Sequence, residues 1–340
     1  MTQMKWVVLV LAALVVGGCT KKEEAAPAVE EKAAADEAKP AAPSEPLLPL
    51  PDAADVDMDK VLLGRSLYFD TALSGDGTIS CASCHSMEHG GAEPRKTSTG
   101  INGFIGPINS PTVLNSSYNF VQFWDGRAKD LQEQAAGPVA NPGEMGANWD
   151  KVVARLAKKK EYSTAFATLY ADGVTQANVT DAIAEYEKSL ITPSRFDEYL
   201  KGDQTAITEA EKKGYETFKE VGCTSCHTGI IVGGTMFQKL GLVKDYFADR
   251  GTPVTEADHG RYNVTKKEQD KHFFKVPTLR NVELTAPYLH DGSRATLEET
   301  VKLMGTYQLG RDLSDAQVNS IVTFLKSLTG ELPAHAVPQG

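Results

Sequence analysis

The motif C-x-x-C-H occurs twice in this chain, at residues 81–85 and 223–227. Two thiols one helical turn apart can add to the vinyl groups of a porphyrin, and the adjacent histidine can then bind its iron. A C-x-x-C pair alone also fits a redox dithiol or half of a zinc site, but a histidine directly after each pair favours haem. The sequence therefore predicts two haem c groups. Their attachment and iron-binding residues would be Cys81, Cys84 and His85 for the first, and Cys223, Cys226 and His227 for the second.

The fifth cysteine, Cys19, follows an unbroken apolar run at residues 6–16. That run is too short to span a membrane and has the form of the hydrophobic region of a signal peptide. The ending Val-Gly-Gly-Cys resembles the lipobox of bacterial lipoproteins, so we expect cleavage after residue 18 and lipidation of Cys19. An ordinary signal peptide with an incidental cysteine is the alternative. Export with lipidation predicts a periplasmic protein whose only attachment to a bacterial membrane is the lipid.

Composition then divides the rest of the chain. Residues 19–51 consist mainly of Ala, Pro, Glu and Lys, which cannot bury enough apolar surface to fold, so we expect a disordered tether. Beyond it, the length of the chain and its 41% hydrophobic residues suffice for two domains. The net charge of −10 and the lack of a basic face argue against nucleic acid as a partner.

Helical patterns dominate the folded part, and strand signals are few. Amphipathic spacing is present at residues 57–69, 149–158, 179–190 and 208–221, and in a segment with a capping box that begins at Ser314. The first and fourth of these segments each carry a glycine four residues before an aromatic residue, which suggests duplication. We therefore expect a mainly α fold of two cytochrome c-like domains, at residues 52–205 and 206–331, followed by a frayed tail at 332–340.

Met304, in the sequence VKLMGTYQLG, lies downstream of the second motif. A thioether is a natural sixth ligand for haem iron, and it stabilises the ferrous state. Methionine also often fills gaps in a hydrophobic core. Spacing alone leaves the two interpretations nearly even.

Three longer segments resemble the bacterial dihaem cytochrome c peroxidase family. They are GPINSPTVLNSSYNFVQFWDGR at 106–127, LQEQAAGPVANPGEM at 131–145 and FKVPTLRNVELTAPYLHDG at 274–292, and the resemblance extends over about residues 52–330. It implies an enzyme that reduces hydrogen peroxide to water with electrons from a small cytochrome c or cupredoxin. The C-terminal haem, with His227 and Met304 as axial ligands, would accept the electrons, and the N-terminal haem would react with peroxide. The resemblance also allows a homodimer.

Matching positions imply roles for individual residues. Trp124 matches a tryptophan that lies between the two haems, although a buried core indole would fit the sequence equally well. Glu144 matches the acid–base glutamate of the family, and Gln134 matches the glutamine beside it. A carboxylate after Pro-Gly would otherwise be read as a solvated loop residue.

Three further matches concern a metal ion. The resemblance implies a calcium site at the interface between the two domains, because Asn109, Thr285 and Pro287 match its ligands. Two of the three would act through backbone carbonyl groups, which suit a hard cation and leave almost no signature in a sequence.

One position departs from the family pattern. Many members carry a histidine on the far side of the peroxide-reacting haem, but in the loop at residues 97–104 Ile101 occupies the matching place and cannot bind iron. His89 could substitute only if a four-residue chain of at most ~14 Å passed around the porphyrin edge. Met87, Lys96 and Met145 are weaker candidates. We therefore expect an N-terminal haem that is open, or bound by water, even when both irons are ferric, and activity without prior reduction.

Two other functions stay open. A dihaem enzyme of the kind that matures methylamine dehydrogenase, and so oxidises a protein, would share this frame, but its second haem has a tyrosine ligand where this chain has Met304. A non-enzymatic dihaem electron carrier or sensor would have no use for Glu144 and Gln134 beside an open haem. A peroxidase is therefore the preferred prediction.

Overall fold

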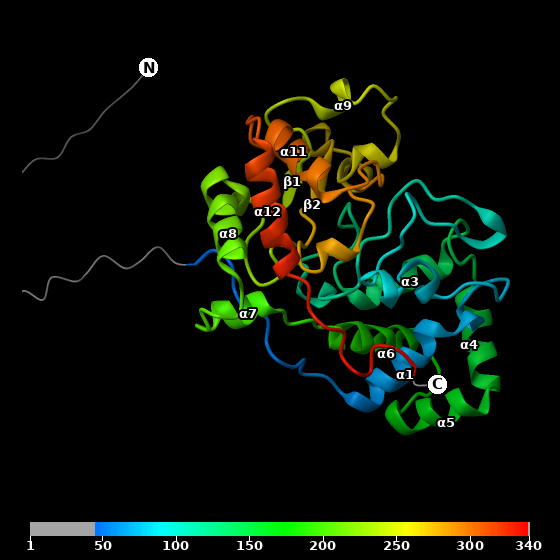
Figure 1. Cartoon of the computed structure of the whole chain (residues 1–340). Coiled ribbons are helices and arrows are strands. Elements are labelled where there is room, and N and C mark those ends of the chain that lie inside the picture. The colour runs from blue at the N-terminus through cyan, green and yellow to red at the C-terminus, as the bar shows by residue number, and fades with distance from the viewer. Residues whose placement is uncertain (1–44, 339–340) are drawn as a thin grey trace, which may run out of the picture. The chain divides into compact units, whose positions relative to one another are not determined.

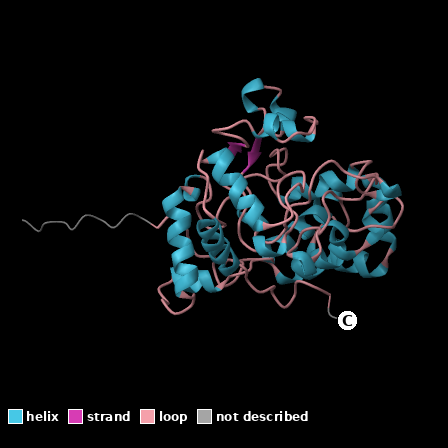
Figure 2. Ribbon diagram, turned by 45° about the horizontal axis from the view of Figure 1, so that its top comes forward, coloured by secondary structure: helices cyan, strands magenta, loops and turns pink. Residues whose placement is uncertain are grey.

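The computed structural model describes residues 45–338, and packing makes one compact unit of the chain from Glu45 onward. The predicted signal peptide at residues 1–18, the predicted lipidation site Cys19 and the predicted tether up to residue 44 lie outside the described residues. Within residues 45–338 the fold is mainly helical, as expected, and Figure 2 shows two short strands among helices and long loops. Strands β1 (Phe237–Lys239) and β2 (Phe273–Lys275) pair antiparallel, with Phe237 opposite Lys275.

Two groups of helices form the bulk of the molecule, and Figure 1 shows them on opposite sides. We call α1 to α6 the N-terminal lobe and α7 to α12 the C-terminal lobe. The N-terminal lobe contains α1 (Met58–Phe69), α2 (Cys81–Cys84), α3 (Leu131–Ala140), α4 (Trp149–Lys158), α5 (Lys160–Leu169) and α6 (Gln176–Ser189). The C-terminal lobe contains α7 (Arg195–Leu200), α8 (Glu209–Val221), α9 (Tyr246–Asp249), α10 (Tyr262–Thr265), α11 (Leu297–Gln308) and α12 (Asp315–Ser327).

The predicted helices are confirmed, and local capping explains their bounds. The side chain of Asp57 accepts hydrogen bonds at the start of α1, and α8 begins with a capping box between Thr208 and Glu211. The capping box predicted at Ser314 starts α12. Helix α6 begins earlier than its apolar pattern indicated, because Thr175 caps it.

Each lobe is built on one close helix crossing. Where α1 crosses α6, a Cβ atom on Gly64 would lie only 1.8 Å from the carbonyl oxygen of Ala182. Where α8 crosses α12, a Cβ atom on Gly214 would lie 2.2 Å from the carbonyl oxygen of Ser320. Only glycine fits at either crossing, so the repeated glycine pattern in the sequence corresponds to a repeated packing contact.

The last part of the predicted tether is ordered, which corrects the expectation for residues 45–51. Leu47 and Leu50 are each 1% exposed. The amide of Leu48 donates to the carbonyl of Gly229, and Leu50 donates to the carboxylate of Asp197. We call residues 45–50 the N-terminal strap. It is ordered because Leu47 packs in the core of the C-terminal lobe and Leu50 is also buried, which outweighs the cost of fixing a short extended chain.

The predicted frayed tail is also wrong for its described part. His335 lies 2.7 Å from the hydroxyl of Ser189, through Nε2, and the hydroxyl of Tyr186 donates to the carbonyl of Ala336 at 2.5 Å. Ala336 is 1% exposed. The end of the chain is fixed because α6 and α1 offer it both an apolar pocket and hydrogen-bonding groups.

Within the C-terminal lobe, a buried ion pair joins α7 to the segment that follows β2. Arg280 and Asp197 are both fully buried, and two nitrogens of the guanidinium donate to the carboxylate at 2.7 and 2.8 Å. Arg280 also donates to the carbonyl of Leu48 in the strap. Phe196 of α7 packs in the C-terminal core, while the domain boundary at 205/206 stays a prediction. None of the described helices combines the length and apolar character needed to cross a membrane.

Candidate haem sites

The first C-x-x-C-H motif opens onto a cavity in the N-terminal lobe. Cys81 and Cys84 lie at the two ends of the single turn of α2, and both line this cavity together with His85. Both thiols are free, and burial raises their pKa values to about 12 and about 11. The hydroxyl of Tyr68 on α1 donates to the carbonyl of His85 at 2.8 Å, which holds the motif against the lobe.

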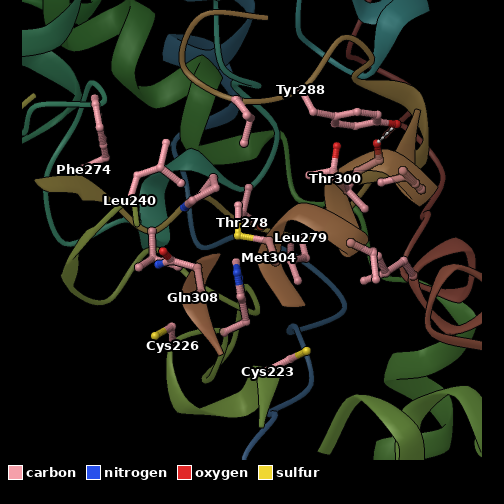
Figure 3. Close-up of a pocket in the computed structure, with 18 of the residues that line it drawn as sticks. Cys223, Cys226, Leu240, Phe274, Thr278, Leu279, Tyr288, Thr300, Met304 and Gln308 are labelled. Carbon is pink, nitrogen blue, oxygen red and sulfur yellow. Dashed lines mark hydrogen bonds between the residues drawn. The ribbon is translucent and has the colours of Figure 1, made fainter. Parts of the chain in front are cut away.

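The second motif lines a separate cavity in the C-terminal lobe. Cys223, Cys226 and His227 reach it from the turn after α8, and Met304 reaches it from α11. Figure 3 shows the Met304 side chain directed into the same pocket as the two cysteines. Met304 also packs against an apolar cluster around Leu240, so the core and ligand interpretations are compatible.

Both histidines are held in the tautomer that iron binding requires. Nδ1 of His85 lies 3.0 Å from the carbonyl of Pro111, and Nδ1 of His227 lies 3.3 Å from that of Val232. A hydrogen donated from Nδ1 leaves Nε2 free as a metal ligand. Burial lowers the pKa of His85, and lowers that of His227 to about 4, so both rings stay neutral. Paired thiols, a preset histidine and a deep cavity fit haem c at both sites.

Trp124 belongs to both cavities at once. Its Nε1 donates to the carbonyl of Asn109 at 3.0 Å. Its ring packs edge-on against Phe274 and His290, each at 6.4 Å between ring centres. The structure therefore places this partly buried indole beside both candidate haem sites and in a packed environment, so the electron-transfer role of Trp124 stays a prediction.

Glu144 and Gln134 both line the N-terminal cavity. Gln134 lies on α3, and Glu144 follows in the turn that ends this helix. A carboxylate oxygen of Glu144 accepts a hydrogen bond from Asn141 at 2.7 Å. Burial raises the pKa of Glu144, while the charge of Arg127 and the Asn141 hydrogen bond act against the rise. The carboxyl group is therefore placed to exchange a proton with a molecule in the cavity.

Ile101 does not line the N-terminal cavity. It is buried beneath the Glu144 turn, and its amide donates to the carbonyl of Glu144 at 2.8 Å. His89 is exposed and lies outside the cavity, which leaves His85 as the single lining histidine among residues 45–338. Of the weaker candidates for a distal ligand, only Met145 lines the cavity.

The three candidate calcium ligands, Asn109, Thr285 and Pro287, all line the C-terminal cavity. The side-chain amide of Asn109 donates to the carbonyl of Arg95 at 3.1 Å, and its backbone amide donates to the carbonyl of His290. These contacts join the two lobes at Asn109. The calcium site itself stays a prediction.

Sequence reasoning missed several residues of the two cavities. Phe104 lines the N-terminal cavity beside Glu144, and Glu187 lines it from α6. Lys275 of β2 lines the C-terminal cavity. A cluster of Asp258, His290 and the partly exposed Asp291 was also missed, but Arg250 forms two hydrogen bonds of 2.6 and 2.7 Å to Asp258 and so compensates its charge. Phe104 and Glu187 belong to no motif, and Lys275, His290 and Asp291 lie in the segment 274–292 without a spacing that singles them out.

Comparisons with known proteins agree with this geometry. The family described as "Di-haem cytochrome c peroxidase" matches residues 58–205. Cytochrome c peroxidase Ccp of Escherichia coli (strain K12) is 51% identical over 300 residues, which are 87% of this chain and 64% of that protein. Cytochrome c551 peroxidase of Nitrosomonas europaea is 47% identical over 299 residues, which are 87% of this chain and 88% of that protein.

A solved structure shows the same fold. It is a MauG-like protein associated with microbial copper homeostasis, with a TM-score of 0.72 and 29% identity over 86% of this chain and 96% of that one. Identity is thus higher to the peroxidases than to this MauG-like protein. Because the identity to the Nitrosomonas protein extends over most of both chains, this protein belongs to the di-haem cytochrome c peroxidase family of oxidoreductases.

Proposed function

We propose that this protein reduces hydrogen peroxide to water with electrons from a small cytochrome c or cupredoxin. The observation that carries the proposal is the difference between the two cavities on either side of Trp124. One contains His85 and a carboxyl group, Glu144, and the other contains both His227 and Met304. An iron with both axial positions filled can store an electron, whereas an iron with one free position can react with a small oxidant.

The haem groups, when bound, supply irons that change charge by one electron and can act on the O–O bond. In the C-terminal cavity His227 and Met304 would bind the two faces of the haem, and the thioether would favour the reduced state. In the N-terminal cavity His85 would bind one face only. We propose that the haem there is open when both irons are ferric, because His85 is the single lining histidine of the described chain.

Glu144 acts as the acid–base residue in this proposal. Its carboxylate takes a proton from one oxygen of hydrogen peroxide and delivers it to the departing oxygen, which leaves as water. Burial raises the pKa of Glu144 toward neutral pH, where the group can both accept and donate a proton. The amide of Gln134, from the neighbouring turn of α3, positions the peroxide by a hydrogen bond.

Trp124 provides the path for electrons between the haems. Its indole touches both cavities, and its Nε1 hydrogen bond to the Asn109 carbonyl fixes the ring. We also propose that Asn109, Thr285 and Pro287 bind calcium beside this path. The bound ion would fix the positions of the two lobes relative to each other. The proposal includes a periplasmic location, a lipid at Cys19 and a homodimer, each of which awaits its own measurement.

The deciding experiment measures steady-state peroxide reduction with a reduced small cytochrome c, with and without reduction of the enzyme beforehand. We expect Glu144→Ala to lower kcat by roughly 10²–10⁴-fold while haem content stays the same. Glu161→Ala, on the exposed face of α5, is the matched control and should match the wild type. An unchanged rate in Glu144→Ala would remove this residue from the mechanism.

A spectroscopic measurement tests the open haem separately. The fully oxidised protein should show a high-spin ferric signal from the N-terminal haem in optical and paramagnetic resonance spectra. Activity should then need no prior reduction. Two wholly low-spin haems, each with two side-chain ligands, would contradict this part of the proposal.

A further inference from the structure

Two ionisable side chains inside the cavities have no role in the reaction proposed above. Glu187 lines the N-terminal cavity from α6, and Lys275 lines the C-terminal cavity from β2. Both are buried, with 4% and 6% of their surface exposed. Acidic and basic side chains are seldom buried to this degree without a partner, so each raises the question of what balances its charge.

Neither side chain has a partner of opposite charge among residues 45–338. The Nζ of Lys275 donates to the side-chain oxygen of Asn119 at 3.1 Å, and the Glu187 carboxyl group forms no ion pair in the described chain. By contrast, the buried side chains of Arg280 and Asp197 form an ion pair with each other. Since an unpaired buried charge is costly, each side chain either stays neutral or carries a charge that interacts strongly with the group that fills its cavity.

The protonation states of Glu187 and Lys275 can change when a charged group binds in the cavity, because no neighbouring ion pair fixes them. Burial raises the pKa of Glu187 to about 8 and lowers the pKa of Lys275 to about 8. The titratable groups that face Glu187 are Tyr68 of α1, Cys81 of α2 and Tyr186 of its own helix, and none of them is a cation. No charged side chain of the described residues shifts the pKa of Lys275.

We propose that Glu187 and Lys275 shift the reduction potentials of the two haems in opposite directions. A ferric haem carries one more positive charge than a ferrous haem, so a carboxylate beside it favours the ferric state. A neighbouring ammonium group favours the ferrous state, and both effects are strong where water is excluded. The inference rests on the proposed function in that both cavities hold haem.

The consequence concerns where the stored electron stays. When its carboxyl group is ionised, Glu187 keeps the peroxide-reacting iron ferric, and when its amino group is protonated, Lys275 keeps the electron-storing iron ferrous. Transfer from the C-terminal haem to the N-terminal haem is then unfavourable until peroxide has reacted. The two buried charges would therefore prevent loss of the electron between turnovers, although neither touches peroxide.

The test is a spectroelectrochemical titration of both haems in the wild type, Glu187→Gln and Lys275→Met, at pH 6 and pH 9. Glu187→Gln should raise the potential of the N-terminal haem, with the larger shift at pH 9, where Glu187 is ionised. Lys275→Met should lower the potential of the C-terminal haem, with the larger shift at pH 6. We expect a change of at least tenfold in each ferric–ferrous equilibrium, equivalent to about 59 mV for one electron.

Each variant is the control for the other, because the haem in the opposite cavity should keep its potential. Glu187→Asp and Lys275→Arg retain the charges and should restore wild-type potentials. If a variant fails to incorporate haem, the wild type provides the test instead. Both of its reduction potentials should fall between pH 6 and pH 9, because Glu187 gains a negative charge and Lys275 loses a positive one. Potentials that do not change with pH, or variants that shift both haems equally, would overturn the inference.

Failure of the proposed function would look different. It would appear in the wild type as fewer than two haems per chain, or as two haems with no peroxide reduction. Failure of the inference alone would leave a wild-type protein with two haems and full activity, and only the potentials of the charge-removing variants would be unaltered.

Discussion

Trp124 touches both haem cavities, and its indole donates to the carbonyl of Asn109. We expect Trp124→Phe to slow electron transfer from the C-terminal to the N-terminal haem, because phenylalanine is harder to oxidise and lacks this hydrogen bond. Stopped-flow absorbance after peroxide addition measures the transfer. Trp149 also donates to a backbone carbonyl, that of Ala136, but lines neither cavity. Equal rates in Trp124→Phe and Trp149→Phe would exclude Trp124 from the path.

Glu144 predicts a pH dependence with a definite sign. The free enzyme needs the carboxylate as a base, so kcat/KM should fall as the pH falls through the pKa of Glu144. Because burial raises that pKa, the fall should begin above the ordinary range of a glutamate near 4.3. Arg127 lowers the same pKa, so Arg127→Met should move the fall to higher pH. Lys129→Met, at an exposed position, should leave the profile unchanged.

Single residues also show the limit of sequence reasoning. The C-x-x-C-H motifs were identified by residue type and spacing, Met304 by its place after the second motif, and Glu144 and Trp124 by resemblance to the family. Neither signal marked Glu187 or Lys275, since α6 and β2 place them beside cavities formed by other segments. Charge inside a cavity is a property of the assembled fold, so no periodicity in the sequence could have indicated it.

Helix crossings set the stability of each lobe. Gly64→Ala would place a methyl group 1.8 Å from the carbonyl oxygen of Ala182, so α1 and α6 must separate. We expect a loss of about 1–3 kcal/mol in the free energy of unfolding, measured with denaturant. Ser66→Ala, at an exposed position of the same helix α1, is the control and should change the free energy of unfolding by less than about 0.5 kcal/mol. Equal effects would show that helix propensity, rather than crowding, governs both positions.

Most helices were predictable because their signals are local. Asp57, Thr208 and Ser314 cap the helices that follow them, and apolar spacing marks the buried faces. The strap and the tail were mispredicted because their residues are polar or proline-rich on average. What orders them is contact with Gly229 and Asp197 for the strap and with Ser189 for the tail, all distant in sequence.

The buried pair of Arg280 and Asp197 joins the strap, α7 and the C-terminal lobe. Removal of one charge in Asp197→Ala leaves the other buried without compensation, so we expect a loss of about 3–5 kcal/mol in the free energy of unfolding. The partly exposed pair of Lys60 and Asp181 is the control, and Lys60→Met should cost about 0–1 kcal/mol. Chemical denaturation of both variants provides the comparison, and similar losses would contradict a special role for the buried pair.

Each end of the described chain is fixed on the lobe opposite to the one that its neighbouring residues form. The strap leads to the N-terminal lobe but is fixed on the C-terminal lobe at Gly229 and Arg280, whereas the tail leaves the C-terminal lobe and is fixed on α6. The two lobes therefore cannot move apart without releasing one end of the described chain from its binding surface, so the strap and the tail both oppose their separation.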